Sequence, residues 1–372
     1  MPRPDVAIVG GGIVGLTTAL YLARERASVA VYDRGDFGKE ASWAGAGIVP
    51  PGDPERARTP ADALRAIGAR QFPYLSAELE QLTGIDNGYR ACGGVEFLSP
   101  EDADVPGLWA AEGIAFERLS PQAARELDPV GAVDGDAHLL PGMAQVRNPW
   151  HLRAVLSACA LAGVELHANT GVESWEASGG RAVALRLANG TRVEAGRFLV
   201  AAGAWSEGVL APLGCRPRVF PVLGQIAALR GPGPSRVLLF GKRYMVPRGD
   251  GLTLIGSTEE PEAGFEKRTT EAGIAGLLAF ARAAVPVLER ATLEASWAGL
   301  RPGSPDGLPF LGAVPGWSNV FVAAGHFRAG VQLSIGTAQV LSELLTDRAP
   351  SVPIGGFALD RAPAATKSAF RS

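Results

Sequence analysis

The hydrophobic positions change their spacing within the first 33 residues of the chain. Residues 6–9 (VAIV) are a short apolar run typical of a buried parallel strand, and residues 13–25 carry apolar side chains at helical spacing. A second short run follows at residues 28–32 (SVAVY). This order predicts a strand, a helix and a second, parallel strand, which together form one βαβ unit.

Two later runs resemble the first strand. Residues 197–202 (RFLVAA) and 320–324 (VFVAA) are short and apolar, and each leads directly into a glycine, as residues 6–9 do. The three junctions are Val9-Gly10, Ala202-Gly203 and Ala324-Gly325. If the three strands share one sheet, the domain built on that sheet is assembled from separate parts of the chain.

The segments between these strands have other patterns. Apolar residues at helical spacing predict helices over 61–82, 152–162, 272–285 and 330–345. Strand-like runs lie at 93–98, 115–119 and 164–167. Asn189-Gly190 predicts a hairpin over 181–193, and the alternation of short strands and turns from 216 to 257 indicates an antiparallel sheet. The Gly- and Pro-rich residues 45–52 indicate a loop.

The composition argues against a nucleic-acid-binding protein. The 372 residues include 35 Lys and Arg against 38 Asp and Glu, a net charge of −3, with no block of like charge. Apolar residues make up 47% of the chain, enough for a sizeable core, and the length suggests two or three domains. Glycine is frequent, with 48 residues and no collagen-like period, so its use in this chain needs an explanation.

Cysteine, histidine and hydropathy restrict the protein further. Cys92, Cys159 and Cys215 lie far apart without a C-x-x-C pair, and the four His lack a metal-binding spacing, so we predict no metal site. Sparse cysteine in an odd number fits a reducing compartment. No run reaches the roughly 18 apolar residues of a membrane helix, and no cleavage-site pattern follows the N-terminal apolar run. We therefore expect a cytoplasmic protein without a membrane span.

The first strand–glycine junction carries a phosphate-binding motif. Gly10, Gly12 and Gly15 have the spacing G-x-G-x-x-G between a predicted strand and a predicted helix, and Asp33 ends the second strand. Gly10 permits a tight turn, Gly12 lets a pyrophosphate approach the helix N-terminus, and Gly15 lets helix and strand pack closely. Asp33 is placed to accept hydrogen bonds from ribose hydroxyls. This context predicts a dinucleotide site without choosing between FAD and NAD.

Small residues follow the second strand. Residues 40–48 have the sequence EASWAGAGI. A nicotinamide dehydrogenase does not need such a run at this place, whereas a long, flat cofactor that passes close to the backbone would need it. An ordinary flexible loop has a similar composition, so this segment by itself leaves both interpretations open.

Two C-terminal segments give the sequence a family resemblance. Residues 297–312 (WAGLRPGSPDGLPFLG) and 323–330 (AAGHFRAG), together with the N-terminal motif, closely resemble the D-amino-acid oxidase family of FAD-dependent oxidoreductases. Within that family the resemblance is to the glycine-oxidising branch that serves thiamine biosynthesis. Residues 243–251 (RYMVPRGDG) are similar to a strand of the family's substrate domain. The resemblance covers nearly the whole chain.

The resemblance implies an α/β fold of two interleaved domains. A discontinuous, Rossmann-like FAD-binding domain of the glutathione-reductase type is expected over 1–85, 142–215 and 299–360. A second, α+β substrate domain built on an antiparallel sheet is expected over 86–141 and 216–298. Residues 361–372 are expected to form a loose tail.

The resemblance also implies roles for single residues. Arg301 would bind the substrate carboxylate, with Tyr244 and Arg328 lining the same pocket. FAD would be bound non-covalently, because no Cys follows Cys215. From the motif and the resemblance, the residues expected at the cofactor are Gly10, Gly12, Ile13, Val14, Gly15, Asp33, Arg34, Ala41, Ser42, Ala46, Gly47, Ile48, Val172, Gly203, Arg301, His326, Phe327, Arg328, Ala329, Gly330, Val331 and Gln332. Three positions depart from the family pattern, namely Asp33 for Glu, Lys242 for His and Ile48 for Met.

The chemistry of these residues suits an amino-acid substrate. A carboxylate needs a fixed, always-charged, bidentate partner, which Arg301 supplies, and its Gly and Pro neighbours indicate a rigid, exposed turn. A Tyr244 hydroxyl could orient the substrate Cα–H toward the flavin. His326 is expected to contact the flavin through its backbone, because hydride transfer from a neutral amine requires no histidine or carboxylate base.

The implied reaction is the FAD-dependent oxidation of glycine, sarcosine or small D-amino acids to the imine or 2-oxo acid. O₂ would be reduced to H₂O₂, and the product would supply thiamine thiazole synthesis. The expected partners are the small amino acid and O₂, with thiazole synthase and a second copy of the chain as further options and no nucleic acid.

Three alternatives stay open. A dehydrogenase of the same fold could oxidise D-amino acids or 2-hydroxy acids and pass the electrons to a quinone. The chain could instead be a flavin-binding subunit of a hetero-oligomeric sarcosine oxidase. An NAD-only protein is the third alternative, which a yellow purified sample would exclude.

Overall fold

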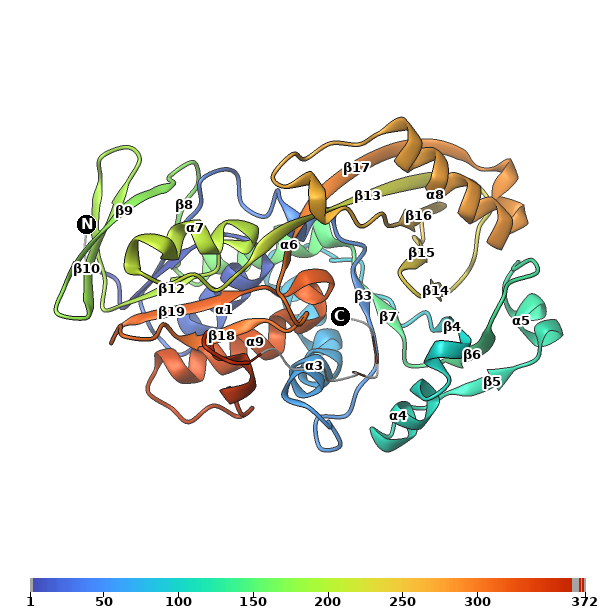
Figure 1. Cartoon of the computed structure of the whole chain (residues 1–372), viewed down its shortest axis with the longest axis horizontal. Coiled ribbons are helices and arrows are strands. Elements are labelled where there is room, and N and C mark those ends of the chain that lie inside the picture. The colour runs from blue at the N-terminus through green and yellow to red at the C-terminus, as the bar shows by residue number, and fades with distance from the viewer. Residues whose placement is uncertain (1–2, 363–367, 369, 371–372) are drawn as a thin grey trace.

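Strands from the start, the middle and the end of the chain lie side by side in one sheet (Figure 1). The computed structural model describes residues 3–362, 368 and 370. The six strands have the order β18-β19-β12-β1-β2-β8, and all neighbours run parallel except β18 and β19. Their bounds are β1 Val6–Val9, β2 Val29–Tyr32, β8 Glu165–His167, β12 Arg197–Val200, β18 Phe310–Ala313 and β19 Val320–Ala324. The prediction that the three strand–glycine junctions share one sheet is confirmed, because β1, β12 and β19 are neighbours.

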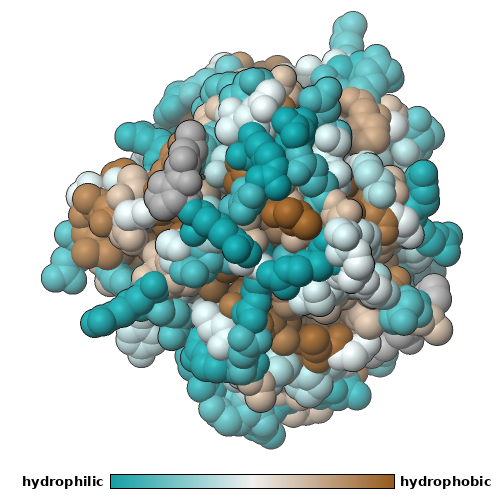
Figure 2. Space-filling view, turned by 90° about the vertical axis from the view of Figure 1, so that its left-hand side faces the viewer, coloured by the Kyte–Doolittle hydropathy of each residue, from teal (hydrophilic) through white to brown (hydrophobic). Residues whose placement is uncertain are grey.

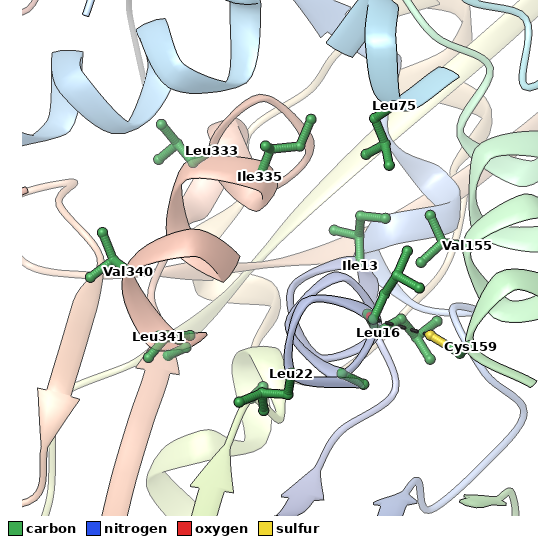
Figure 3. Packing of buried hydrophobic residues seen from close by; sticks show 14 of the residues in the cluster. Ile13, Leu16, Leu22, Leu75, Val155, Cys159, Leu333, Ile335, Val340 and Leu341 are labelled. Carbon is green, nitrogen blue, oxygen red and sulfur yellow. Dashed lines mark hydrogen bonds between the residues drawn. The ribbon is translucent and has the colours of Figure 1, made fainter. Parts of the chain in front are cut away.

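Alternate residues of these strands face two different cores, because successive side chains of a strand point to opposite faces. On one face, Ile8 packs among four helices, and Figure 3 shows Leu16 beside Cys159 in this core. The helices are α1 Ile13–Arg24, α3 Pro60–Thr83, α6 Asn148–Leu161 and α9 Gly330–Leu345. On the other face, Val9 packs toward a three-stranded sheet and the short helix α7. These elements are β9 Val172–Ser178, β10 Arg181–Leu187, β11 Arg192–Glu194 and α7 Ser206–Leu210, and the predicted hairpin is β10 and β11.

A second, eight-stranded sheet forms the other part of the fold. Its order is β17-β13-β16-β15-β14-β4-β6-β5, and neighbours run antiparallel apart from β14 and β4. Helix α8 (Glu271–Ala284) packs on one face through Ile274 and Leu277. The bounds are β4 Gly94–Leu98, β5 Glu117–Leu119, β6 Asp136–Leu140, β13 Phe220–Arg230, β14 Val237–Phe240, β15 Arg243–Pro247, β16 Leu252–Gly256 and β17 Thr292–Gly303. The predicted fold class is confirmed, while the residue boundaries of the two domains stay a prediction.

The long strand β17 connects the two sheets. It pairs with β13 along its whole length, and both run across the top of the molecule in Figure 1. Trp297 Nε1 donates a hydrogen bond to the carbonyl oxygen of Ala44 at 3.0 Å. Gly299 lies so close to α2 (Ala41–Ala44) that a Cβ there would come within 2.6 Å of the Ala44 Cβ. The run of small residues after β2 is therefore held directly against the second sheet.

The segment predicted as a loop at 45–52 is only partly a loop. Ile48–Val49 form β3, which pairs with β7 (Ala144–Gln145), and helix α2 comes just before it. A one-turn helix and a two-residue strand are too short to show a period, so their pattern is not visible in the sequence. The short helices α4 (Val105–Ala111) and α5 (Pro121–Leu127) escape prediction for the same reason.

Parts of the C-terminal segment are packed against the fold. Arg361 forms an ion pair with Asp306 at 2.7 Å, and the ring of Phe370 lies 6.0 Å from the ring of Trp109. The loose tail predicted for 361–372 otherwise falls on residues 363–367, 369 and 371–372, which lie outside the described residues. Phe370 also borders the cavity described below.

Hydrophilic and apolar residues are interspersed on the end of the molecule shown in Figure 2. Within residues 3–362, 368 and 370, no helix combines the length and the hydropathy of a membrane span. The same residues include no group of three or more His, Cys, Asp or Glu side chains that could bind a metal ion, so the predicted lack of a metal remains a prediction.

Candidate active site

One large cavity lies where the carboxyl ends of the parallel strands meet the second sheet. It has a volume of about 330 Å³ and is partly open to solvent, which lies within the range of small-molecule binding sites. Gly10, Asp33 and Gly203 line it at the ends of strands of the first sheet, and Ile226 and Leu239 line it from the second. This position outside the carboxyl ends of parallel strands is where α/β sheets bind ligands.

Nearly all residues that the sequence singled out line this one cavity. The exceptions are Gly15 and Ala329. A Cβ on Gly15 would collide with the carbonyl oxygen of Gly10, so Gly15 serves the packing of α1 on β1. Ala329 is 1% exposed and belongs to the helical core of the first sheet.

The turn between β1 and α1 has the properties of an anion-binding turn. Gly10 has φ +111°, and a Cβ there would collide with the carbonyl oxygen of Ala201 on the neighbouring strand. Gly12 caps α1 without a side-chain hydrogen bond, and the first turn holds no acidic residue. Ile13 N donates to Ser42 Oγ at 2.9 Å. The N-terminal N–H groups and the helix dipole therefore favour a negative group in the cavity at this point.

Asp33 is held by the backbone around that turn. Its carboxylate accepts a hydrogen bond from Gly11 N at 2.7 Å and another from Gly35 N at 2.9 Å. Burial raises the pKa of the Asp33 carboxyl, and the two N–H donors act in the opposite direction. Asp33 lines the cavity next to Arg34, where the motif places the ribose.

The backbone of the small residues from α2 to β3 is held by hydrogen bonds from two side chains. Asn148 Nδ2 donates to the carbonyl oxygen of Ser42 at 2.8 Å, and Arg248 Nη2 donates to that of Ala46 at 2.7 Å. Gly47 has φ +71°, and a Cβ there would collide with the carbonyl oxygen of Val146. Among the described residues, the buried Asn148 Oδ1 has no hydrogen-bond partner, and Asn148 lines the cavity. Asn148 Oδ1 is therefore a hydrogen-bond acceptor without a partner in the described part of the chain, beside the well-held backbone from α2 to β3.

Arg301 lines the cavity from the second sheet. It lies in β17 and is partly buried, so the exposed turn predicted from its Gly and Pro neighbours is wrong; these residues sit in a strand paired with β13. Arg301 Nη2 donates to Ser257 Oγ at 2.6 Å and Nη1 to the carbonyl oxygen of Thr258 at 3.2 Å. Burial lowers the pKa of the Arg301 guanidinium, and the nearby Tyr244 hydroxyl acts in the opposite direction.

Two glycines of the second sheet make room for these side chains. A Cβ on Gly224 of β13 would collide with both terminal nitrogens of Arg301. A Cβ on Gly256 of β16 would collide with the ring and the hydroxyl of Tyr244, which lies in the neighbouring strand β15. Arg301 and Tyr244 therefore lie flat over the sheet at the floor of the cavity.

Glu259 pairs with two cations that line the cavity near Arg301. Lys242 Nζ lies 2.9 Å from Glu259 Oε1, and Arg328 forms an ion pair with the other oxygen of Glu259. Lys242 and Arg328 both line the cavity. Glu259 thus supplies a counter-charge to two cations near Arg301, and no feature of the sequence singled it out.

His326 lines the cavity from the connection between β19 and α9. It is 3% exposed, and its Nε2 lies 3.1 Å from Thr337 Oγ1. Burial lowers the pKa of His326 to about 4, so the ring is neutral near pH 7. Phe327, the next residue, has φ +46°, which turns the chain sharply into α9 along the cavity wall.

Several cavity residues were not predicted. Trp205, two residues after the Gly203 junction, could have been found from that junction. Glu96, Gly224 and Ser257 could not, because their place in the cavity depends on how distant strands pair. The further residues of the lining that the sequence analysis did not assign include Glu40, Asn148, Ile226, Leu239, Leu300 and Phe370.

Comparison with known proteins gives a consistent result. The family model described as FAD dependent oxidoreductase (DAO) matches residues 5–344. The glycine oxidase of Pseudomonas putida is 37% identical over 360 residues, which cover 95% of this chain and 98% of that protein. The bifunctional protein ThiO/ThiG of a Synechocystis species is 34% identical over 96% of this chain and 54% of its own length. The crystal structure of glycine oxidase from Geobacillus kaustophilus superposes with a TM-score of 0.90 at 33% identity, covering 97% of this chain and 99% of that one.

Proposed function

The chain belongs to the DAO family of FAD-dependent oxidoreductases, and from this premise we propose that it oxidises glycine and related small amines, including sarcosine and small D-amino acids. The substrate loses a hydride from Cα and a proton from nitrogen and becomes the imine, which water hydrolyses to the 2-oxo acid and ammonia, or to the 2-oxo acid and methylamine for sarcosine. The two electrons and two protons pass to O₂ and give H₂O₂. The glycine oxidases of 33–37% identity over nearly the whole chain support this choice of substrate.

The observation that carries the proposal is the guanidinium of Arg301. It faces the cavity with its hydrogen bonds made to a hydroxyl and a carbonyl oxygen, and no described carboxylate pairs with it. A partly buried cation without a counter-ion favours an anionic ligand, and a guanidinium suits a carboxylate because its fork binds both oxygens. The ligand would therefore be a small molecule that carries a carboxylate.

Two residues near Arg301, Tyr244 and His326, bear on how the substrate would be held. Tyr244 lies beside Arg301 at the cavity, and its hydroxyl would orient the substrate. His326 is neutral, because burial lowers its pKa to about 4, so it would not act as a cation toward the amine. Holding the substrate in one orientation is the protein's part in this reaction, while the cofactor carries the electrons.

The cavity residues from the β1–α1 turn, from the end of β2 and from residues 41–48 fit FAD. The turn at Gly10 and Gly12 offers the α1 N-terminus to a pyrophosphate, and Asp33 lies where the ribose hydroxyls would be. The wall from Ala41 to Ile48, with the free acceptor of Asn148, would lie along the flavin. FAD, when bound, supplies hydride acceptance from Cα and electron transfer to O₂. We propose that it is held non-covalently.

Partner and compartment are further parts of the proposal. The relative named ThiO/ThiG supports an association with a thiazole synthase, because this chain matches about half of that bifunctional protein. Three free cysteines support a cytoplasmic location, and a homo-oligomer is compatible with the fold.

Peroxide formation by the purified holoenzyme tests the proposed function. Glycine, sarcosine, D-alanine and D-proline are each added under air to measure H₂O₂, and anaerobically to measure bleaching of the flavin absorbance. We expect peroxide with glycine and loss of about 100-fold or more in kcat/KM for Arg301→Ala, with the flavin spectrum kept. Bleaching without peroxide would favour the dehydrogenase, and no bleaching with any of the four amines would disprove the proposal.

A further inference from the structure

A segment of the second sheet reaches across to the first. Residues 261–269 lie between β16 and α8, and both ends of this segment are tied to Gln225, a fully buried residue of β13. Gln225 Nε2 donates to Glu260 Oε1 at 2.8 Å, and Gln225 Oε1 accepts from Thr270 N at 2.7 Å. Leu223 and Glu260 also exchange two backbone hydrogen bonds. We call residues 261–269 the strap, because its ends are fixed and its middle projects away from its own sheet.

Two side chains of the strap contact the first part of the fold. The ring of Phe265 lies 5.3 Å from the ring of Trp205, although Phe265 is 54% exposed. Lys267 Nζ lies 2.7 Å from Glu40 Oε2. Trp205 follows β12 and Glu40 follows β2, so the strap bridges two strand ends of the parallel sheet.

Arg34 completes a closed ring of contacts. Its guanidinium stacks over the Trp205 ring at 3.6 Å, and its Nη2 lies 3.3 Å from Glu40 Oε1. These contacts run from Phe265 to Trp205, Arg34, Glu40 and Lys267, and the chain closes the ring through Glu266 of the strap. It is made of three segments that are far apart in the sequence.

This ring lies at one end of the cavity. Arg34, Glu40 and Trp205 follow β2 and β12 of the first sheet and line it together with Val172, whereas Arg301 and Tyr244 line it from the second sheet. Arg34 directly follows Asp33, the acid that the motif places at the ribose. The ring is therefore at the adenosine end of the cofactor site.

We propose that the strap retains the cofactor. Phe265 and Lys267 do not line the cavity themselves but hold Trp205 and Glu40, which do, so FAD leaves faster when the strap releases this part of the wall. Trp205 and Arg34 present an indole and a guanidinium plane, the two kinds of surface on which an adenine base stacks. The strap belongs to the connections of the substrate-binding sheet, so cofactor retention depends on both parts of the fold.

The expected effect is moderate, because the ring is partly exposed to solvent. The Lys267, Glu40 and Arg34 side chains are 40%, 39% and 50% exposed, so each ion pair contributes little by itself. The aromatic contact and the ion pair must both break before the strap lifts. We therefore expect FAD release to become about three- to tenfold faster when both are removed.

The test measures the rate of FAD release from the holoenzyme. Holoenzyme is diluted strongly, and the rise in fluorescence of free FAD is followed for wild type, Phe265→Ala, Lys267→Ala and the double variant. Arg268→Ala is the matched control, because Arg268 pairs with Glu266 inside the strap. Phe265→Trp tests rescue by a ring of similar kind. Circular dichroism and the thermal midpoint check that each variant is folded.

The outcomes separate the proposal from a general effect on the fold. It predicts faster release for the double variant, near wild-type release for Arg268→Ala and Phe265→Trp, and an unchanged flavin absorbance spectrum before dilution. Raising the salt from 0.05 to 0.5 M should speed release from wild type more than from Lys267→Ala, because salt screens the ion pair. Equal rates for wild type and the double variant, or equal acceleration by Arg268→Ala, would overturn it. None of these readouts depends on the substrate.

Discussion

The guanidinium of Arg301 lies directly over Gly224 of the neighbouring strand, where a Cβ would collide with both of its terminal nitrogens. Arg301 pairs in register with Val222, so Gly224 is its diagonal neighbour on β13. The position of the cation that we propose to bind the substrate thus depends on the absence of a side chain on another strand. Gly224 also lines the cavity, which makes it part of the site.

Gly224→Ala should therefore displace Arg301 without removing it. We expect kcat/KM for glycine to fall at least about tenfold, mainly through KM, because the carboxylate loses a well-placed partner. FAD content should stay near that of wild type. Gly276→Ala is the control, because a Cβ at Gly276 in α8 meets nothing within 4 Å. An unchanged KM in Gly224→Ala would show that Arg301 does not bind the carboxylate in this position.

Gly256→Ala should act on Tyr244 in the same way. A Cβ there would collide with the Tyr244 hydroxyl and ring, so the side chain must move off the sheet. We expect a larger loss of kcat/KM than in Tyr244→Phe, which removes one hydrogen bond and should cost about two- to tenfold. Steady-state kinetics with glycine and D-alanine measure both. If Tyr244→Phe equals wild type while Gly256→Ala is impaired, Tyr244 acts through its ring.

Glu259→Gln should shift the choice of substrate. The change removes the negative charge that Lys242 and Arg328 share beside the cavity, so a second carboxylate on the substrate becomes more favourable. We expect the ratio of kcat/KM for iminodiacetate to that for glycine to rise about tenfold. Arg70→Gln, at an exposed ion pair with Asp53 and Glu55, is the control for loss of a surface charge pair. A ratio equal to that of wild type would contradict the role of Glu259.

Acid should destabilise the fold through two buried histidines. Burial lowers the pKa of His151 and of His326 to about 4, against about 6.5 in the unfolded chain. Between these values the unfolded chain binds protons that the folded chain does not. The stability that these two rings contribute is therefore complete above pH 6.5 and is lost as the pH falls to 4, by up to about 3 kcal/mol for each.

Urea unfolding at pH 7 and pH 4.5 measures this effect. His151→Asn should lose less stability between the two pH values than wild type, whatever its stability at pH 7. His167→Asn is the comparison variant, because the His167 side chain is 25% exposed whereas His151 is 1% exposed. An equal pH dependence in wild type and His151→Asn would contradict the assignment to His151.

The cofactor end of the site was largely predictable from the sequence, and the substrate end was not. Gly10, Gly12 and Asp33 fall within one βαβ unit, so a short stretch of sequence already contains their relation. Arg301 was predicted as a substrate-binding residue, yet its neighbours Gly and Pro indicated a turn where the structure has a strand. The family resemblance located Arg301, and the pairing of β13 with β17 explains how it is held.

The contacts between the strap and the first sheet were also only partly predictable from the sequence. Arg34 and Glu40 follow the second strand, so the local sequence pattern could indicate that they lie near the cofactor site. Phe265 and Lys267 lie in a segment without a clear period, and their partners come from residues 34–40 and 205. Such contacts depend on the packing of the two sheets, which no local pattern encodes.

The sequence by itself determined the βαβ unit, its glycine-rich turn and the return of the chain to the same sheet at Gly203 and Gly325. These features depend on short-range periodicity and on glycines at strand ends, which are local properties of the chain. Only the tertiary structure decided how Arg301 lies over Gly224, where Glu259 places its charge and how the strap contacts Trp205 and Glu40. These relations join residues 17 to 227 positions apart, so most of them exist only once the two sheets have packed together.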